Sequence, residues 1–337
     1  MNKDALQQWF QLTDENRRNI FLETSRRLNL PAAAIEKDWW VLRTLQLVYQ
    51  TEIAPHTVFK GGTSLSKAWN VIEPFSEDID LALDRKFLGF DNEMTASQVK
   101  KLRRDSFKYI TTTYLPLLQK TFKDAGFNDV TLDLVETKSN DEDPVKIAAS
   151  YYSLTEPSAY LAPKVLIEIG SRSLREPFSE KEIISLVDEH FKSSHFADQH
   201  ISIPTVNPER TFLEKIFLLH EEFQQSSEKI KVDRLSRHLY DLEKLMDTEY
   251  AIKALADKEL YRHIVEHRKT ITPLRGIDYA NHIPEKISPV PPEHLVAAWK
   301  KDYEQMQESM IYATSLSFDK LIERIVLLKS RINKISF

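Results

Sequence analysis

The chain has 337 residues, of which 42% are hydrophobic and 29% charged, and its formal net charge is −5. These values are ordinary for a globular protein long enough for roughly two domains, and they exclude a globally basic nucleic-acid-binding protein. The absence of cysteine excludes disulfides and thiolate ligands, the first residues are too polar for a secretory signal, and no apolar run reaches the roughly 18 residues of a membrane span. We therefore expect a cytoplasmic protein with no membrane partner.

The first 125 residues predict helices interrupted by two short strands. Helical periodicity is carried by Ile35, Trp39 and Leu42, which recur every three or four residues and share one helix face. The expected elements, in chain order, are helices over 4–49 with a break at 29–31, a strand at 56–60, a helix at 64–69, a strand at 79–83 and a long helix over 95–125.

The rest of the chain changes from strands to helices near Pro208. Three more strands are expected at 130–135, 146–152 and 165–169, and five helices at 208–222, 230–246, 250–268, 293–311 and 315–334. The chain therefore predicts an α+β protein with two domains: N-terminal helices and a core over 1–205, and a helical lobe over 206–337.

Asp78-Ile79-Asp80-Leu81 is the pattern most informative about chemistry. Side chains alternate between the faces of a strand, so the two carboxylates point one way while Ile79 and Leu81 point to the core. A spacing of roughly 6.6 Å along the strand suits the binding of magnesium ions, which prefer hard oxygen ligands. Taken alone, the pattern favours an edge strand with two solvated aspartates.

Gly61-Gly62-Thr63-Ser64 lies between a predicted strand and a predicted helix, in a chain with only six glycines. Unpaired N–H groups and hydroxyls at a helix N-terminus favour a polyphosphate. Taken alone, the segment favours a tight turn in which Thr63 or Ser64 caps the helix.

Glu168 supplies a third carboxylate on a predicted strand, with Leu166 on its own face and Ile167 and Ile169 on the other. It is a candidate third metal ligand, or a base for an attacking hydroxyl. The alternative is a solvated glutamate on an edge strand.

Several motifs in the right order closely resemble those of the AbiEii/AbiGii-type toxin nucleotidyltransferases, which belong to the polymerase-β-like nucleotidyltransferase superfamily. The resemblance covers most of the chain and is more specific than any single motif. The motifs are Glu36-Lys37-Asp38-Trp39-Trp40, Phe59-Lys60-Gly61-Gly62-Thr63-Ser64-Leu65-Ser66-Lys67-Ala68-Trp69, Phe75-Ser76-Glu77-Asp78-Ile79-Asp80-Leu81, Thr211-Phe212-Leu213-Glu214-Lys215 and Arg237-His238-Leu239-Tyr240-Asp241-Leu242.

The resemblance implies a polymerase-β-like core with a mixed sheet, and transfer of a nucleoside monophosphate from an NTP to an acceptor hydroxyl with release of pyrophosphate. It also implies roles for particular residues. Gly62, Thr63 and Ser64 would contact the NTP phosphates, with Gly61 beside them, Asp78 and Asp80 would bind Mg²⁺, Lys215 would touch the triphosphate, and Asp241 would be the essential acidic residue of the last motif.

Helical spacing places Thr211 with Lys215, and Arg237 with Asp241, on common helix faces. For the second pair the alternative is an intrahelical salt bridge. The sequence departs from the family at Pro74, where an arginine is frequent. Fifteen residues separate Gly62 from Asp78, a spacing closer to the toxin branch than to the antibiotic-modifying enzymes.

The resemblance also implies a cognate antitoxin, and the tRNA 3′ end is the preferred acceptor because some members of the family modify it. The predicted helix with Lys100, Lys101, Arg103 and Arg104 could bind a phosphate backbone, but such a run is more often a solvated face. A protein side chain or a small molecule as acceptor, and a non-catalytic nucleotide-binding regulator, are the alternatives.

Overall fold

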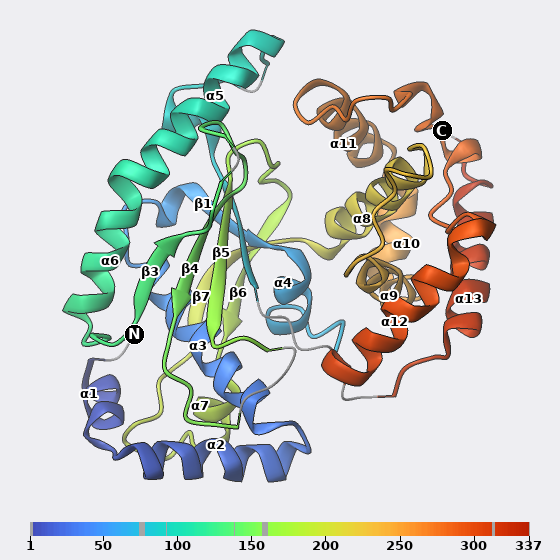
Figure 1. Ribbon diagram of the computed structural model, residues 1–337. Helices are drawn as coiled ribbons and strands as arrows, with labels where there is room; N and C mark the ends of the chain where they lie inside the picture. Colours follow the sequence, from blue (N-terminus) through green and yellow to red (C-terminus); the bar gives the residue numbers. More distant parts are fainter. Residues whose placement is uncertain are drawn as a thin grey trace. The chain divides into compact units, whose positions relative to one another are not determined.

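The computed structural model describes residues 3–73, 78–91, 93–137, 139–156, 161–311 and 314–336 (Figure 1). The chain divides into two compact units, one formed by residues 1–68 and 75–205 and the other by residues 69–74 and 206–337. The α+β prediction is confirmed, because a mixed sheet with helices forms the first unit and helices form the second.

Within the described residues, the sheet has seven strands in the order β3-β4-β5-β2-β1-β7-β6. Strand β2 runs parallel to β5, and β1 parallel to β7, whereas β1–β2, β3–β4 and β4–β5 are antiparallel pairs. The strands are β1 (Thr57–Lys60), β2 (Asp78–Leu83), β3 (Thr131–Leu134), β4 (Val145–Ser150), β5 (Lys164–Gly170), β6 (Phe178–Ile183) and β7 (Ile201–Val206).

The sequence predicted the first five strands to within two residues but missed β6 and β7. Strand β6 lies at the edge of the sheet and reads Phe-Ser-Glu-Lys-Glu-Ile, without a continuous apolar face. Strand β7 contains Pro204, a residue that cannot donate a ladder hydrogen bond and usually argues against a strand.

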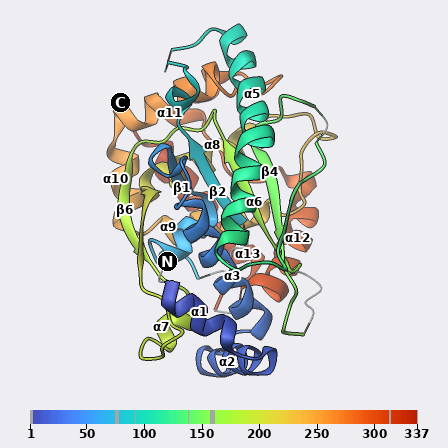
Figure 2. The same ribbon diagram turned by 90° about the vertical axis from the view of Figure 1, so that its left-hand side faces the viewer.

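The helices of the first unit differ from the prediction mainly where they begin and end. Thr13 caps the second helix by accepting a hydrogen bond from the Asn16 N–H, so the region 4–49 is broken twice rather than once. The predicted helix 95–125 is continuous but contains a π-helical turn at Ile110–Tyr114, and it runs along the sheet (Figure 2). The helices are α1 (Lys3–Gln11), α2 (Asp14–Leu28), α3 (Ala32–Val48), α4 (Gly61–Lys67), α5 (Ala96–Tyr109), α6 (Leu115–Asp124) and α7 (Leu186–His190).

Three consecutive charged residues of α3 are buried, and each meets polar partners from a different segment. Glu36 accepts four hydrogen bonds from the segment 153–155. Lys37 donates to the carbonyl oxygens of residues 162 and 164, at the start of β5. Asp38 accepts from the N–H of residue 186, which begins α7, and forms an ion pair with Lys67 at the end of α4. Helix α3 therefore fixes the positions of β5, α7 and α4, because buried charges are tolerated only when they are compensated.

The second unit consists of helices α8 (Pro208–Phe223), α9 (Ser236–Leu245), α10 (Glu249–Ala256), α11 (Lys258–Thr270), α12 (Val296–Met310) and α13 (Phe318–Ile332). The predicted helix 250–268 is two helices, because Asp257 caps α11 by accepting from the Leu260 N–H at 2.9 Å. None of the described helices is long and apolar enough to span a membrane.

A buried polar cluster ties α8 to α11 and to the segment 279–288. Glu221 forms an ion pair with Arg268 and accepts from His282 Nε2 at 3.0 Å. His220 pairs through Nε2 with the Asn281 carbonyl oxygen at 3.1 Å, and its Nδ1 accepts from a backbone N–H at 3.2 Å. These two contacts fit the neutral imidazole, which has one donor and one acceptor nitrogen.

Stability is expected to fall as the pH drops from about 6.5 towards 4, the range between the ordinary pKa of histidine and that of His220. Burial, reinforced by the neighbouring His282, lowers the pKa of His220 to about 4. The unfolded chain therefore binds more protons than the folded chain in this window. Urea unfolding of His220→Gln should show a slope of stability against pH that is shallower by up to about 1.4 kcal/mol per pH unit.

The matched control is His294→Gln, which removes an exposed histidine. An equal change of slope in the two variants would contradict the assignment to His220.

Candidate active site

Four charged side chains form a row across neighbouring strands of the sheet. Lys60 on β1 is the register partner of Asp80 on β2, Asp80 is the partner of Glu168 on β5, and Glu168 is the partner of Lys146 on β4. Directly paired residues face the same side of a sheet. Asp78 precedes Asp80 by two residues and shares its face. The structure thus brings Asp78, Asp80 and Glu168 to one face of the sheet.

The burial pattern agrees with this placement. Ile79 and Leu81 are fully buried, whereas Asp78 and Asp80 are partly exposed. On β5, Glu168 is partly exposed between the buried Ile167 and Ile169. The carboxylates therefore lie on the accessible face, as the alternation of side chains requires.

Lys146 is a residue of this site that the sequence reasoning missed. Its ammonium nitrogen lies 2.5 Å from Glu168 Oε1, so the carboxylate already has a cationic partner. The alternation along 146–152 indicated which face Lys146 occupies, but the antiparallel register with Glu168 depends on strands that are 22 residues apart in the sequence. Lys60, at the other end of the row, was also missed.

Gly61 lies against the acidic pair at the point where β1 passes into α4. Its φ is +81°, and a Cβ added at this position would lie 2.0 Å from Asp80 Oδ2. Only glycine therefore allows the backbone to approach this carboxylate so closely. Helix α4 begins at Gly61, three residues before the expected start at Ser64.

The hydroxyls that follow Gly61 and Gly62 are committed to backbone carbonyls. Thr63 donates to the Asp78 carbonyl oxygen, which joins the start of α4 to β2. Ser64 Oγ donates to the Gly61 carbonyl oxygen at 2.9 Å. Neither side chain caps the helix, whose N-cap residue is Lys60 with no side-chain hydrogen bond. This is the arrangement that the sequence left open between a phosphate site and a simple capped turn, and the simple cap is not observed.

The acidic pair has the donors that a magnesium ion requires. Mg²⁺ in nucleotide sites is bound through one or two carboxylates, with substrate phosphates and water as the other ligands. Asp78 and Asp80 provide such a pair, and the lack of a side chain at Gly61 leaves room at Asp80 Oδ2. Among the described residues, no group of three or more carboxylate or histidine side chains is arranged to hold a metal by itself. The geometry therefore fits an ion held by Asp78 and Asp80, while Glu168 pairs with Lys146.

Lys215 and Asp241 form a second charged group, in the helical unit. Lys215 Nζ on α8 lies 2.7 Å from Asp241 Oδ2 on α9, and both side chains are nearly buried. Lys215 Nζ also lies 3.1 Å from His238 Nδ1. Burial first, and then the charges of Lys215 and Arg237, hold the pKa of His238 well below its ordinary value. His238 is therefore neutral, and its Nδ1 accepts a hydrogen bond from the ammonium group.

The pairing of Asp241 differs from the alternative considered for its motif. Asp241 pairs with Lys215 of the neighbouring helix, and the intrahelical salt bridge with Arg237 is not among the ion pairs of the described residues. The Thr211 hydroxyl, one turn before Lys215, is buried and has no hydrogen-bond partner there.

The remaining predicted residues are placed as follows. Lys100, Lys101 and Arg104 are exposed on α5, whereas Arg103 donates to the Asp141 carbonyl oxygen at 2.9 Å and pairs with its carboxylate. The motif residues Phe75, Ser76 and Glu77, and the departure at Pro74, lie outside the described residues.

Comparison with known proteins gives one family match. The model of a family described as "Nucleotidyl transferase AbiEii toxin, Type IV TA system" matches residues 45–324, which is most of the chain. A search of curated proteins finds no match.

Solved structures share the fold. The chain is similar to MenT4, a nucleotidyltransferase toxin from Mycobacterium tuberculosis H37Rv, with a TM-score of 0.54 and 16% identity over 96% of this chain and 91% of that one. It also matches JHP933 from Helicobacter pylori, with a TM-score of 0.41 and 14% identity over 89% of this chain and 93% of that one. At this identity, the similarity to MenT4 shows the fold alone.

Gly61→Ala is expected to weaken Mg²⁺ binding by more than about tenfold, because the new methyl group would displace the Asp80 carboxylate. Gly89→Ala is the matched control: its φ is +80°, and a Cβ there meets nothing within 4 Å. Both variants should lose about 1 kcal/mol of stability from the strained φ. Titration calorimetry with Mg²⁺ and urea unfolding measure the two effects. Equal Mg²⁺ affinity in the two variants would show that the close approach at Asp80 is irrelevant to the metal.

Proposed function

The chain belongs to the AbiEii family of nucleotidyltransferase toxins of type IV toxin–antitoxin systems, and on that premise we propose that it transfers a nucleoside monophosphate from an NTP to the 3′-terminal hydroxyl of tRNA. Pyrophosphate is the second product. The proposal includes Mg²⁺ as the metal, a cognate antitoxin as the regulatory partner and the cytoplasm as the place of action, where both substrates are found.

The observation that carries the proposal is the close approach of Gly61 to Asp80. It joins the strand with the two aspartates to the glycine segment that begins α4. A pair of carboxylates beside backbone N–H groups at a helix N-terminus combines metal ligands with donors for phosphate oxygens. A solvated edge strand would not need this approach, and β2 lies in the middle of the sheet, between β5 and β1.

The residues of the first unit would divide the work of the reaction. The acceptor oxygen attacks the α-phosphorus, the bond to the pyrophosphate oxygen breaks, and the hydroxyl proton passes to a base. Asp78 and Asp80 would hold Mg²⁺, which when bound neutralises phosphate charge and aligns the reacting oxygens. Glu168 is the candidate proton acceptor or additional ligand, and in either role it must exchange its contact with Lys146.

Lys215 is proposed to stabilise the leaving pyrophosphate, together with the backbone N–H groups of Gly61–Ser64. Its ion pair with Asp241 holds the ammonium group in place, and the neutral His238 accepts a second of its three N–H bonds. This leaves one donor of the ammonium group for a phosphate oxygen. Asp241 is therefore proposed to act by positioning Lys215.

Transfer to tRNA is tested by incubating the purified chain with total tRNA, Mg²⁺ and each labelled NTP in turn. Asp80→Asn should lower the rate of labelling by at least about a thousandfold, because it removes a charged metal ligand at the reacting phosphate. The matched control is Asp133→Asn, an exposed aspartate on β3, which should retain full activity.

The other outcomes separate the alternatives. Label on a protein band and not on tRNA would replace tRNA by a protein acceptor. Label on a small molecule alone would indicate an enzyme of the antibiotic-modifying type. NTP binding without any transfer would support a non-catalytic regulator.

The exposed cations of α5 are proposed to contact the tRNA backbone. Lys100 and Arg104 are one helical turn apart, and Lys101 is adjacent to Lys100, so the three present a basic surface. Replacing all three by glutamine should weaken tRNA binding and lower the dependence of log affinity on log salt by up to about three, one for each phosphate contact.

The control for the basic surface replaces Lys86, Lys123 and Lys192, which are exposed elsewhere on the first unit, and it changes the net charge equally. Filter binding between about 50 and 200 mM salt measures both quantities. The same loss of affinity in both triple variants would show that net charge, and not α5, determines binding.

A further inference from the structure

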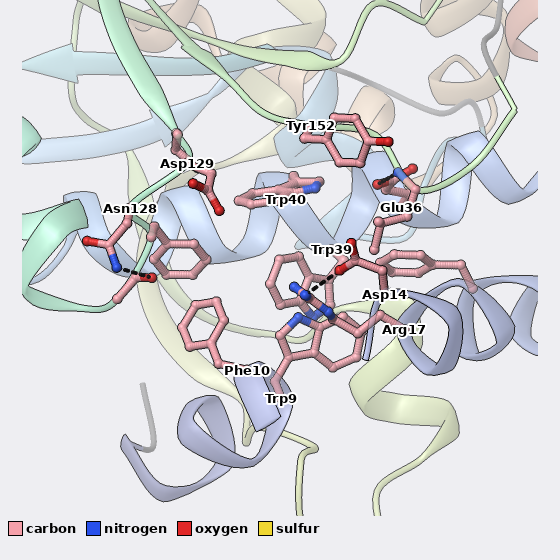
Figure 3. A pocket seen from close by; sticks show the side chains of 15 residues that line it. Trp9, Phe10, Asp14, Arg17, Glu36, Trp39, Trp40, Asn128, Asp129 and Tyr152 are labelled. Carbon is pink, nitrogen blue, oxygen red and sulfur yellow. Dashed lines mark hydrogen bonds and ion pairs between the residues drawn. The ribbon is translucent and has the colours of Figure 1, made fainter. Parts of the chain in front are cut away.

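A pocket of about 500 Å³ in the first unit has walls made largely of aromatic side chains (Figure 3). They come from α1, α2 and α3, from the turn after α6 and from the segment after β4. Among the described residues that line it, none belongs to the proposed catalytic set. The volume falls within the range of small-molecule sites, roughly 300–1,000 Å³.

The aromatic walls are held rigidly on the protein side. Trp40 stacks on Tyr151 with ring centroids 4.5 Å apart, and Trp9 stacks on Trp39 at 4.7 Å. Tyr152, by contrast, has 74% of its surface exposed, which is unusual for a side chain of this size. The pocket thus combines fixed aromatic rings with one exposed ring at its mouth.

The charges around the pocket are mainly negative. Its lining contains three carboxylates, of Asp14, Glu36 and Asp129, and one guanidinium, of Arg17, which gives a formal charge of −2. Arg17 is paired with Asp14 at 2.6 Å, so it does not neutralise the other two. Glu36 is stabilised by hydrogen bonds from uncharged groups, which leave its negative charge in place.

Asp129 is the carboxylate best placed to meet a ligand. It is exposed, and Figure 3 shows it beside Trp40, with its carboxylate directed towards the indole ring. Aromatic faces attract cations through the ring quadrupole, and carboxylates add a Coulomb attraction. The same charges disfavour a phosphate or a nucleic-acid backbone.

We propose that this pocket binds an organic cation, a guanidinium or ammonium group, against Trp40 and Tyr152 with Asp129 as its counter-ion. The chemistry is shared by a free polyamine and by the arginine or lysine side chain of a peptide. The site is independent of the proposed transfer reaction.

The test is titration calorimetry of the full chain with N-acetyl-arginine amide and with N-acetyl-citrulline amide, which has the same shape without the charge. The arginine compound should bind at least about tenfold more tightly, because only it carries the cation. Spermidine and a short arginine-containing peptide then distinguish the two sources of the cation. Tighter binding of spermidine indicates a small-molecule site, and tighter binding of the peptide indicates a protein partner.

Two exposed substitutions test the site itself without disturbing the core. Asp129→Asn and Tyr152→Leu should each weaken binding of the arginine compound by about three- to fivefold. Asp124→Asn is the control, since this exposed carboxylate pairs with Lys120 and does not line the pocket. Asp80→Asn should leave the affinity unchanged, which separates this site from the proposed active site.

Equal binding of the arginine and citrulline compounds would overturn the proposal and leave an apolar pocket. Loss of binding in Asp80→Asn alone would assign the cation to the acidic strand instead. Absence of heat for every cation tested, up to about 10 mM, would also overturn it, because cation–π contacts in a desolvated pocket should give a measurable affinity.

Discussion

The burial of charge on α3 is the constraint on which the first unit depends. Glu36, Lys37 and Asp38 occupy successive positions of a helix that is almost entirely buried, so they point in three different directions. Each must find its own compensation, because an isolated buried charge costs far more than folding can supply. The partners are a loop, the first residues of β5, the N-terminus of α7 and Lys67 of α4. A helix outside the sheet thereby sets the position of α4, the helix that begins beside Asp80.

The acidic pair gains its meaning from what the sheet places next to it. An isolated D-x-D pattern favours solvated aspartates, but β2 is a central strand, and its neighbours bring Glu168 and Lys146 into the same row. Gly61 then brings a helix N-terminus against Asp80. The row alternates cations at its ends with carboxylates at its centre, so the charge at the centre is only partly neutralised. Such a surface is suited to a divalent cation that arrives with a polyanionic substrate.

The second unit arranges its charges by a different principle. Lys215, Asp241 and His238 come from two helices, and the ion pair between them is nearly buried. A buried pair of this kind contributes little net stability in comparison with apolar packing, so its retention is better explained by orientation of the lysine. The family membership and this geometry together support a phosphate-binding role, which the transfer assays address through the nucleotide.

The sequence alone determined the features that depend on local backbone geometry. The period of two put Asp78 and Asp80 on one face of a strand, and the period of 3.6 placed most of the helices, because side-chain direction follows directly from the backbone of a single element. The edge strand β6 and the proline-containing β7 were invisible, since neighbouring strands, and not their own residues, make them strands. Only the tertiary structure paired Lys146 with Glu168 and showed why position 61 must be glycine, because both depend on register between segments distant in the chain.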